Sequence, residues 1–184
     1  MKPTAELSHE HQAILRMIGT LGRIADRLDA GVAVDPDDLD RSVEFIRGFA
    51  DKCHHAKEED YLFPEMEKAG IPCEGGPIGV MLAEHARGRE FAAAMAGAVP
   101  GIRSGDRRAA EAFVAEARGY SGLLTQHIFK EDHILFPMGD ARLTPDQQAS
   151  LQAAFADVEQ NIIGEGQHEK FHRLLERLEK AYPA

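Results

Sequence analysis

The sequence has few cysteines, no long hydrophobic run and no excess of basic residues. Its two cysteines, Cys53 and Cys73, form no C-x-x-C pair, and the chain opens on polar residues instead of the apolar core of a secretory signal. We therefore expect a cytoplasmic protein without a structural disulfide, with Cys53 acting as a small buried hydrophobe. The longest apolar stretch, around residues 91–99, is too short to cross a bilayer, so we expect no membrane partner.

Acidic residues outnumber basic ones, 31 to 21, which gives a net charge of −10. Binding to nucleic acid needs a basic face that displaces counterions, and no such face stands out in the sequence. A small cluster at Arg103, Arg107 and Arg108 fits a solvated turn better. We expect no nucleic-acid partner, and the sequence identifies no protein partner.

No segment alternates with the two-residue period of a strand, so the sequence predicts an all-α protein. Asp35 before Pro36 and Thr144 before Pro145 mark two helix starts, and Pro100-Gly101 is expected to separate two helices. A chain of 184 residues fits a single domain, residues 1–184. The predicted helices cover residues 4–28, 36–70, 77–98 and 106–139, followed by an additional C-terminal helix, 144–181, interrupted at Gly164-Glu165-Gly166.

A segment of eleven residues occurs twice with a similar sequence, at residues 54–64 and at residues 127–137. In each copy a histidine precedes a glutamate by four positions, and Leu-Phe-Pro closes the segment. Positions i and i+4 share one face of a helix, so each copy points an imidazole and a carboxylate the same way. We expect Leu-Phe to pack in the core and the proline to kink the helix.

A further histidine precedes each copy at a similar distance. Glu10-His11 lies 43 residues before His54, and Glu84-His85 lies 42 residues before His127, counted from the histidines. The chain therefore consists of two halves, each with one helix that carries a histidine and one that carries His-x-x-x-Glu. Two such hairpins predict a four-helix bundle in residues 1–140, with these side chains meeting in its interior.

Imidazole and carboxylate together suit iron, manganese or zinc, and a metal would neutralise charges that are costly to bury. Glu58 and Glu131 are the natural carboxylates to bridge two ions. With about six positions on each ion, two carboxylates, a bridging oxide or hydroxide and four histidines leave two positions open; a fifth histidine leaves one. The candidate ligands are His11, His54, Glu58, His85, His127 and Glu131, with His168 as the candidate fifth histidine.

The other polar residues near these positions have weaker claims. His172 shares a helix face with His168, and His9 lies on another face than His11. We expect His55 and His133 to make outer or surface contacts. Glu59 and Asp132, which follow the bridging acids, are positioned to accept a hydrogen bond from a metal-bound imidazole, although solvated acids on a helix flank are equally compatible with the pattern.

The order of these motifs resembles that of the hemerythrin-like family, the HHE cation-binding domains. The matching residues are His11, His54-x-x-x-Glu58, His85 and His127-x-x-x-Glu131. The resemblance implies an up-down four-helix bundle that holds two non-haem iron ions with carboxylate bridges.

Two positions depart from the oxygen carriers of that family. The carriers have His-x-x-x-His on the third helix, whereas Arg89 follows His85 here, and they have Asp five residues after the fourth-helix histidine, whereas Glu131 follows His127 by four. His168 is the candidate to supply the missing imidazole.

These observations favour a di-iron protein that binds or senses dioxygen, nitric oxide or peroxide. One alternative is a di-iron peroxidase or oxidase, in which Tyr61 or Tyr120, each seven residues from a ligand histidine, mediates redox chemistry; we favour the interpretation of both tyrosines as core aromatics that need no such role. Another alternative is iron storage or delivery. We favour a binding or sensing protein over an enzyme that turns over.

Overall fold

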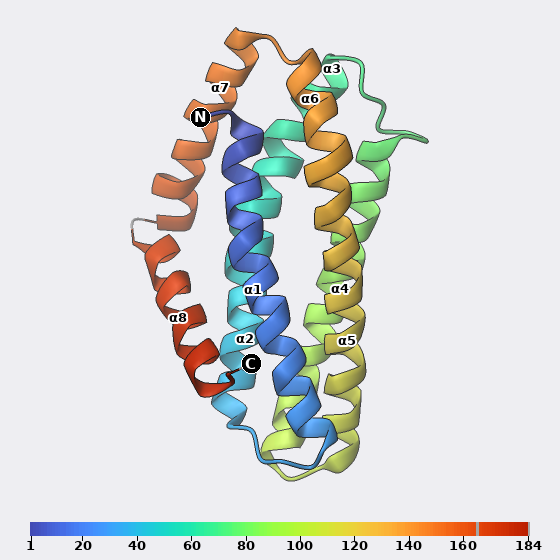
Figure 1. Cartoon of the computed structure of the whole chain (residues 1–184), viewed down its shortest axis with the longest axis vertical. Coiled ribbons are helices and arrows are strands. Elements are labelled where there is room, and N and C mark those ends of the chain that lie inside the picture. Colours follow the sequence, from blue (N-terminus) through green and yellow to red (C-terminus); the bar gives the residue numbers. More distant parts are fainter. Residues whose placement is uncertain (165, 184) are drawn as a thin grey trace.

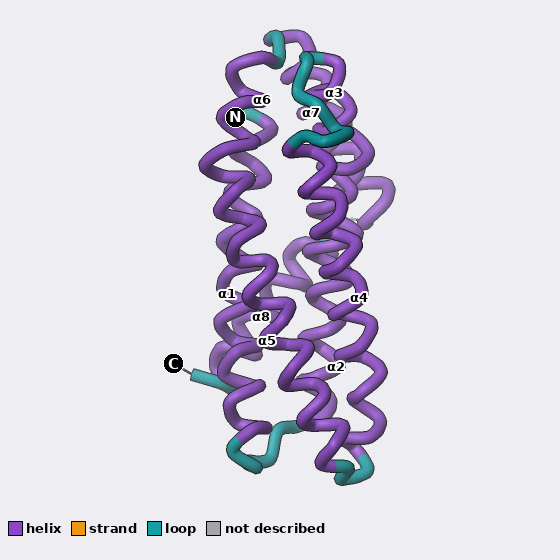
Figure 2. Tube along the Cα trace, turned by 90° about the vertical axis from the view of Figure 1, so that its right-hand side faces the viewer, coloured by secondary structure: helices purple, strands orange, loops and turns teal. Residues whose placement is uncertain are grey.

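The computed structural model describes residues 1–164 and 166–183, and these residues form helices joined by short loops, with no strand among them (Figures 1 and 2). We use α for an α-helix and η for a π-helical segment, in which backbone hydrogen bonds span five residues. In chain order the elements are α1 (Pro3–Asp29), α2 (Pro36–Phe45), η1 (Ile46–His55), η2 (Glu58–Leu62), α3 (Phe63–Lys68), α4 (Pro77–Arg103), α5 (Arg107–Lys130), η3 (Glu131–Leu135), α6 (Phe136–Arg142), α7 (Pro145–Asp157), η4 (Val158–Gly164) and α8 (Gln167–Ala181).

Four helical rods run up and down the long axis of the molecule (Figures 1 and 2). The first rod is α1, the second runs from α2 to α3, the third is α4, and the fourth runs from α5 to α6. The C-terminal elements α7, η4 and α8 lie along one side of this bundle, against α1 and the second rod. The predicted all-α, up-and-down bundle with an additional C-terminal helical segment is confirmed.

The sequence signals for helix starts are also confirmed. The side chain of Asp35 accepts a hydrogen bond from the N–H of Asp37, and Thr144 forms a capping box with Gln147. The predicted interruption of the C-terminal helix includes Glu165, which lies outside the described residues. Gly166, the N-cap residue that precedes α8, has a φ of 78°, a backbone conformation that favours glycine.

Pro100 does not end a helix, contrary to the prediction. The helix α4 continues through it to Arg103. Because Pro100 lies in the last turn, its missing N–H removes one hydrogen bond near an end that already frays. The turn is completed by the N–H of Ser104, which donates to the carbonyls of Pro100 and Gly101, and by Val99, which is buried against the neighbouring helices.

The core consists of two apolar clusters. The larger cluster fills the half of the bundle around Met17, Phe49 and Phe113. The smaller cluster includes Leu62 and Phe63 of the first repeat together with their counterparts in the second repeat. The prediction that the Leu-Phe pairs pack in the core is therefore confirmed. Each buried aromatic or aliphatic side chain contributes about 1.5–3 kcal/mol to stability.

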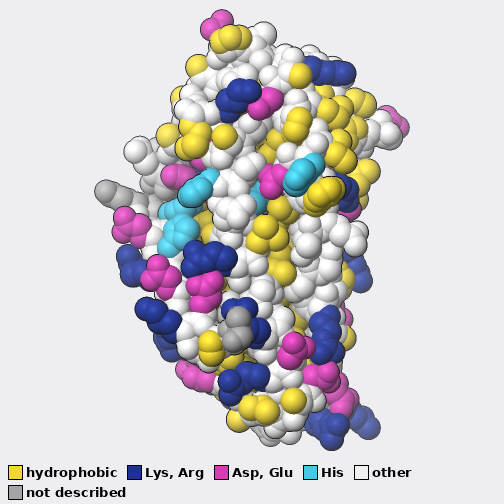
Figure 3. Space-filling view, in the orientation of Figure 1, with side chains coloured by type: hydrophobic (Ala, Val, Ile, Leu, Met, Phe, Trp, Pro, Cys, Tyr) yellow, Lys and Arg dark blue, Asp and Glu magenta, His cyan; other side chains and the backbone are white. Residues whose placement is uncertain are grey.

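The surface shown in Figure 3 carries acidic and basic side chains interspersed with one another. In the described part of the chain, no helix combines the length and the apolar character that crossing a membrane would require.

Candidate metal centre

Six of the predicted ligands meet inside the bundle, and each is at most 1% exposed. One comes from each of six elements: His11 from α1, His54 from η1, Glu58 from η2, His85 from α4, His127 from α5 and Glu131 from η3. All four rods therefore contribute to one buried cluster, which we call the His–Glu cluster.

Each glutamate of the cluster contacts one histidine of its own rod and one from another rod. Glu58 lies 3.5 Å from His54 Nε2 through Oε1 and 3.4 Å from His85 Nε2 through Oε2. The Oε2 atom of Glu131 lies 3.2 Å from His127 Nε2 and 3.3 Å from the Nε2 atom of the α1 histidine. Carboxylates that reach both halves in this way have the arrangement expected of bridging ligands.

Two groups of possible ligand atoms lie in and beside the His–Glu cluster, each with its atoms within 4.8 Å of one another. One group consists of His11, His54, Glu58 and Glu131, and the other of His55, Glu58, His85 and His127. Glu58 belongs to both groups. Two cations can therefore be held side by side by this set of side chains.

Five polar atoms at the centre of the cluster have no hydrogen-bond partner in the described part of the chain. Among the described residues, neither oxygen of Glu58 and neither oxygen of Glu131 has a hydrogen-bond partner, and the Nε2 atom of His11 has none either. Leaving buried polar groups without a partner costs several kcal/mol, and more for charged groups. Cations between the two carboxylates would supply the missing partners, so the residues present fit a metal centre.

The ionisation of these groups points the same way. Burial, together with the negative charge of Glu131, raises the pKa of Glu58 well above its usual value. Burial also opposes ionisation of Glu131, but the positive charge of His127 and the close approach of the Nε2 atoms of His11 and His127 outweigh it and lower its pKa. For His11, burial opposes protonation, while Asp132 and Glu131 raise its pKa to about 9. Glu58 therefore does not ionise readily beside the charged Glu131 unless a further cation lies between the two carboxylates.

Every histidine of the cluster also carries a carboxylate on its outer nitrogen. The four Nδ1-to-oxygen distances lie between 2.7 and 2.9 Å. The pairs are His11 with Asp132, His54 with Glu10, His85 with Glu59, and His127 with Glu84. A carboxylate on Nδ1 holds the proton there, which turns the lone pair of Nε2 inward toward a metal.

For two of these outer carboxylates, Glu59 and Asp132, the sequence is compatible with this role or with a solvated position on the helix flank, and the structure places them on the imidazoles. The other two, Glu10 and Glu84, had been missed. The signal was present in the repeated Glu-His dipeptides that precede each His-x-x-x-Glu pair. Each of these glutamates supports a histidine on the next rod and not its own neighbour.

Both glutamates of the cluster begin a π-helical segment. The N–H of Phe63 donates to the carbonyl of Glu58, and the N–H of Phe136 donates to that of Glu131, five residues back in each case. A proline follows each phenylalanine, and its ring crowds the carbonyl four residues earlier. The wider π-turn accommodates that ring, so the helical rod continues past the proline. Such turns are frequent at functional sites.

The structure places His168 outside the His–Glu cluster. Its side chain is 34% exposed, and its Nε2 lies 3.7 Å from Glu10 Oε1. The other oxygen of that carboxylate, Oε2, is the one that pairs with His54 Nδ1. The ring packs against Phe49 with centroids 5.0 Å apart, and His172 packs on the same ring. His168 lies on α8, outside the four rods, so Glu10 stands between it and His54.

The remaining histidines and the tyrosines have distinct surroundings. His133 is exposed and stacks on Phe129, whereas His55 is buried against His85. Tyr120 is buried in the larger apolar cluster. These positions leave His55 as the histidine adjoining the cluster whose role the sequence did not identify.

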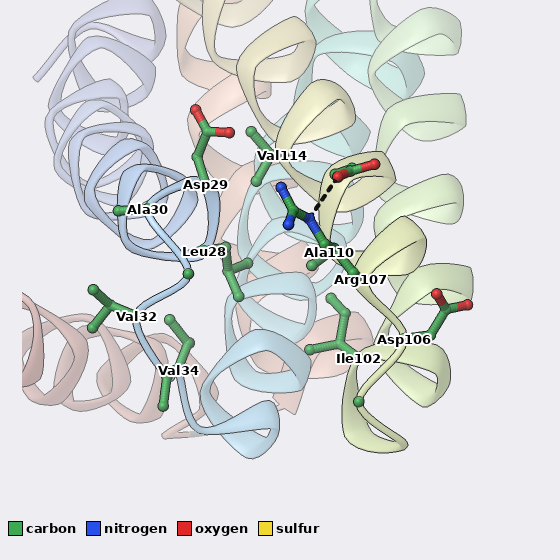
Figure 4. Close-up of a pocket in the computed structure, with 14 residues that line it drawn as sticks. Leu28, Asp29, Ala30, Val32, Val34, Ile102, Asp106, Arg107, Ala110 and Val114 are labelled. Atoms are coloured by element: carbon green, nitrogen blue, oxygen red, sulfur yellow. Dashed lines mark hydrogen bonds and ion pairs between the residues drawn. The ribbon is translucent and has the colours of Figure 1, made fainter.

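Of two cavities in the bundle, one lies away from the His–Glu cluster and the other reaches His55. One cavity, of about 470 Å³, lies where the α1–α2 and α4–α5 connections meet, and its lining includes Leu28, Val34, Ile102 and Val114 (Figure 4). The ion pair between Arg107 and Glu111 also lines it. Its lining includes no histidine, and it belongs to the end of the bundle remote from the cluster. A second cavity, of about 210 Å³, reaches His55.

Comparison with known proteins agrees with this geometry. Uncharacterized proteins from Mycobacterium bovis and from two strains of Mycobacterium tuberculosis are each 25% identical to the chain over 160 residues, which is 87% of this chain and 62% of the relative. The chain thus spans less than two thirds of the length of these relatives. No solved structure matches it significantly. The hemerythrin HHE cation binding domain matches residues 2–139, and the chain therefore belongs to that family.

Proposed function

We propose that this protein holds two iron ions between Glu58 and Glu131 and binds dioxygen, nitric oxide or peroxide at a coordination position that its side chains leave open. The observation that carries this proposal is the set of four carboxylate oxygens that have no partner among the described residues and that face inward-pointing imidazole nitrogens. Carboxylate with imidazole, and no thiolate, is a donor set that suits iron, manganese and zinc. When bound, a pair of iron ions supplies reversible electron transfer to a small molecule.

The protein's own residues prepare the site for this role. The outer carboxylates fix the tautomer and the orientation of the histidines. The apolar clusters on either side, the smaller of which contains both Phe63 and Phe136, exclude bulk water. Phe136 also stacks on His11, with ring centroids 5.6 Å apart and planes within 7°. A rigid, dry site of this kind favours binding of small uncharged molecules.

The first experiment is to load the metal-free protein with ferrous iron without oxygen and to measure bound iron. We expect two ions per chain, and fewer than two in Glu58→Gln and Glu131→Gln. Glu90→Gln serves as the control, since that carboxylate is exposed. A wild-type protein that retains no iron under these conditions would contradict the metal proposal.

The second experiment adds dioxygen, nitric oxide or peroxide to the loaded protein and follows the visible spectrum. At least one of the three should give a new absorption that reverses on removal or reduction. An unchanged spectrum with all three would overturn the ligand-binding proposal while leaving metal binding intact.

A peroxidase is the second candidate, because Tyr120 lines the cavity that reaches His55. Steady-state consumption of peroxide that disappears in His54→Ala would favour the enzyme, and a single stoichiometric reaction would favour binding.

We further propose that the protein acts in the cytoplasm, because both cysteines are free thiols in the described structure, as a reducing compartment would keep them.

A further inference from the structure

His55 is a buried imidazole that makes no hydrogen bond to any residue that the structure describes. It is 4% exposed, and neither ring nitrogen has a partner within the described residues. Buried polar side chains are nearly always satisfied, because an unsatisfied donor or acceptor costs about 1–3 kcal/mol. A histidine that adjoins a metal cluster in this state requires an explanation, since an apolar residue would fill the same space without the cost.

The position of His55 matches that of a ligand. Its ring lies parallel to that of His85, with centroids 3.8 Å apart. One of its nitrogens belongs to the group of ligand atoms formed with Glu58, His85 and His127, all within 4.8 Å of one another. Its Nδ1 lies 3.5 Å from Asp51 Oδ1, one helical turn earlier. A carboxylate on the Nδ1 side, with Nε2 left for the interior, is similar to the arrangement of the other four histidines, whose Nδ1 atoms lie closer to their carboxylates, at 2.7–2.9 Å.

Arg89 holds the outer carboxylates on this side of the site. Its Nε donates to Asp51 Oδ1 at 2.6 Å, and its Nη2 donates to Glu59 Oε1 at 2.6 Å. Glu59 is the acceptor for His85 Nδ1. One guanidinium thus orders the carboxylates that face two stacked histidines. The residue four positions after His85 therefore supports imidazoles and does not supply one.

We propose that His55 is the fifth imidazole of the metal centre and binds, through Nε2, the ion held by His85 and His127. The proposal rests on the proposed function, since it needs two bound ions. One ion then has three imidazoles and the other has two. With about six positions on each ion, the open position falls on the ion beside His11 and His54.

The two halves of the chain support this asymmetry. By the alignment of the two repeats, the counterpart of His55 is Ile128, which is buried at 3% exposure in the larger apolar cluster. The fold therefore accepts an apolar residue at the equivalent place, and His55 is not required to fill space.

His55→Ile copies that apolar counterpart and is the direct test. Mutation of an outer-shell partner typically lowers metal affinity 10–100-fold, so loss of a direct ligand should weaken binding of one ferrous ion at least about tenfold and leave the other unchanged. The iron Mössbauer spectrum should show two unlike sites in the wild type that become more alike in the variant. His133→Ala, which removes an exposed histidine, is the control and should match the wild type in both measurements.

A second variant keeps the test decisive if replacement by isoleucine perturbs packing. His55→Ala opens space beside the cavity of about 210 Å³, which Gly88, Ala92 and Tyr120 also line. Free imidazole should enter this space and restore the second ion and the wild-type Mössbauer spectrum. Circular dichroism of the metal-free variants reports on folding.

Binding of both ions by His55→Ile with wild-type affinity and spectrum would overturn the proposal. The proposal would also be overturned if His55→Ala folds but free imidazole does not restore its second ion and the wild-type Mössbauer spectrum. A wild type that does not hold two ions would instead refute the proposed function. These results are distinguishable, because they appear in different proteins.

Discussion

Lys57 is a fully buried ammonium group that joins three carboxylates beside the metal cluster. Its Nζ donates to Glu10 and Glu159 at 2.6 Å and to Glu6 at 3.0 Å, and its side chain is 0% exposed. Glu10 also pairs with His54 Nδ1. Burial opposes the charged form of Lys57, but the neighbouring carboxylates, Glu10 foremost, outweigh it and raise the pKa of Lys57 above its usual value. The group therefore stays charged throughout the neutral range.

We expect Lys57→Met to destabilise the metal-free protein by about 3 kcal/mol. Removing one partner of a buried ion pair costs about 3–5 kcal/mol, because the other charge remains buried without compensation. Only Glu10 is deeply buried, at 4% exposure, whereas the side chains of Glu6 and Glu159 are 30% and 39% exposed and regain water. The expected loss therefore lies at the low end of that range. Methionine retains the apolar stem, so little packing is lost.

The free energy of unfolding is measured in urea for the metal-free wild type and variants. Adding Glu10→Gln to Lys57→Met should recover part of the loss, because it removes the stranded charge, and the double-mutant cycle gives the coupling energy. Lys68→Met is the control: that pair with Glu65 is exposed and should cost no more than about 1 kcal/mol. If Lys57→Met costs no more than this control, the claim of a stabilising buried cation is refuted.

Two further predictions concern packing and thiol reactivity. A Cβ at Gly48 would lie 2.2 Å from the ring of Phe171, so Gly48→Ala should lower the free energy of unfolding in urea by about 1–3 kcal/mol. A Cβ at Gly22 meets no described atom within 4 Å, so Gly22→Ala should raise that free energy by about 0.5–1 kcal/mol. Equal effects of the two substitutions would contradict this prediction. Burial, with a contribution from nearby acids, raises the pKa of Cys53 to about 12. Iodoacetamide at pH 8 should therefore modify only Cys73 in the native chain and both cysteines after unfolding, as measured by mass spectrometry. Rapid modification of both thiols in the native chain would disprove this prediction.

The inner histidines and glutamates were predictable because their spacing is local. His54 with Glu58 and His127 with Glu131 are each one helical turn apart, so a sequence pattern places both side chains on one face without knowledge of the tertiary structure. The duplication then identified the matching helices. The up-and-down bundle followed from helix starts and ends that capping residues mark.

His55 and His168 were harder for the same pattern to place. His55 lies in η1, where the wider π-turn rotates residues relative to their directions on an α-helix, so the assumption that only one of two adjacent histidines faces inward fails. The position of His168 depends on how α8 packs on the outside of the bundle, which no local spacing encodes. Pro100 was misjudged because the packing of a long helix outweighs one missing hydrogen bond.

The two halves of the bundle repeat the same lysine–glutamate contact, but the lysine is buried to different extents in the two halves. Lys57 binds Glu10 in one half, and Lys130 binds Glu84 in the equivalent way in the other. Yet Lys57 is 0% exposed, and the side chain of Lys130 is 32% exposed. The difference arises because Glu159, in the C-terminal segment, joins the carboxylates around Lys57.

That segment lies beyond residues 2–139, the part that the family match covers, and it nevertheless reaches the outer layer of the metal centre. A chain of contacts runs from Glu159 through Lys57 and Glu10 to His54. The orientation of one ligand histidine is therefore tied to the packing of a C-terminal helix, whereas its counterpart His127 depends on the four rods alone within the described contacts. A centre built from two similar halves is in this way made unequal by its surroundings, on the same side where we place the open coordination position.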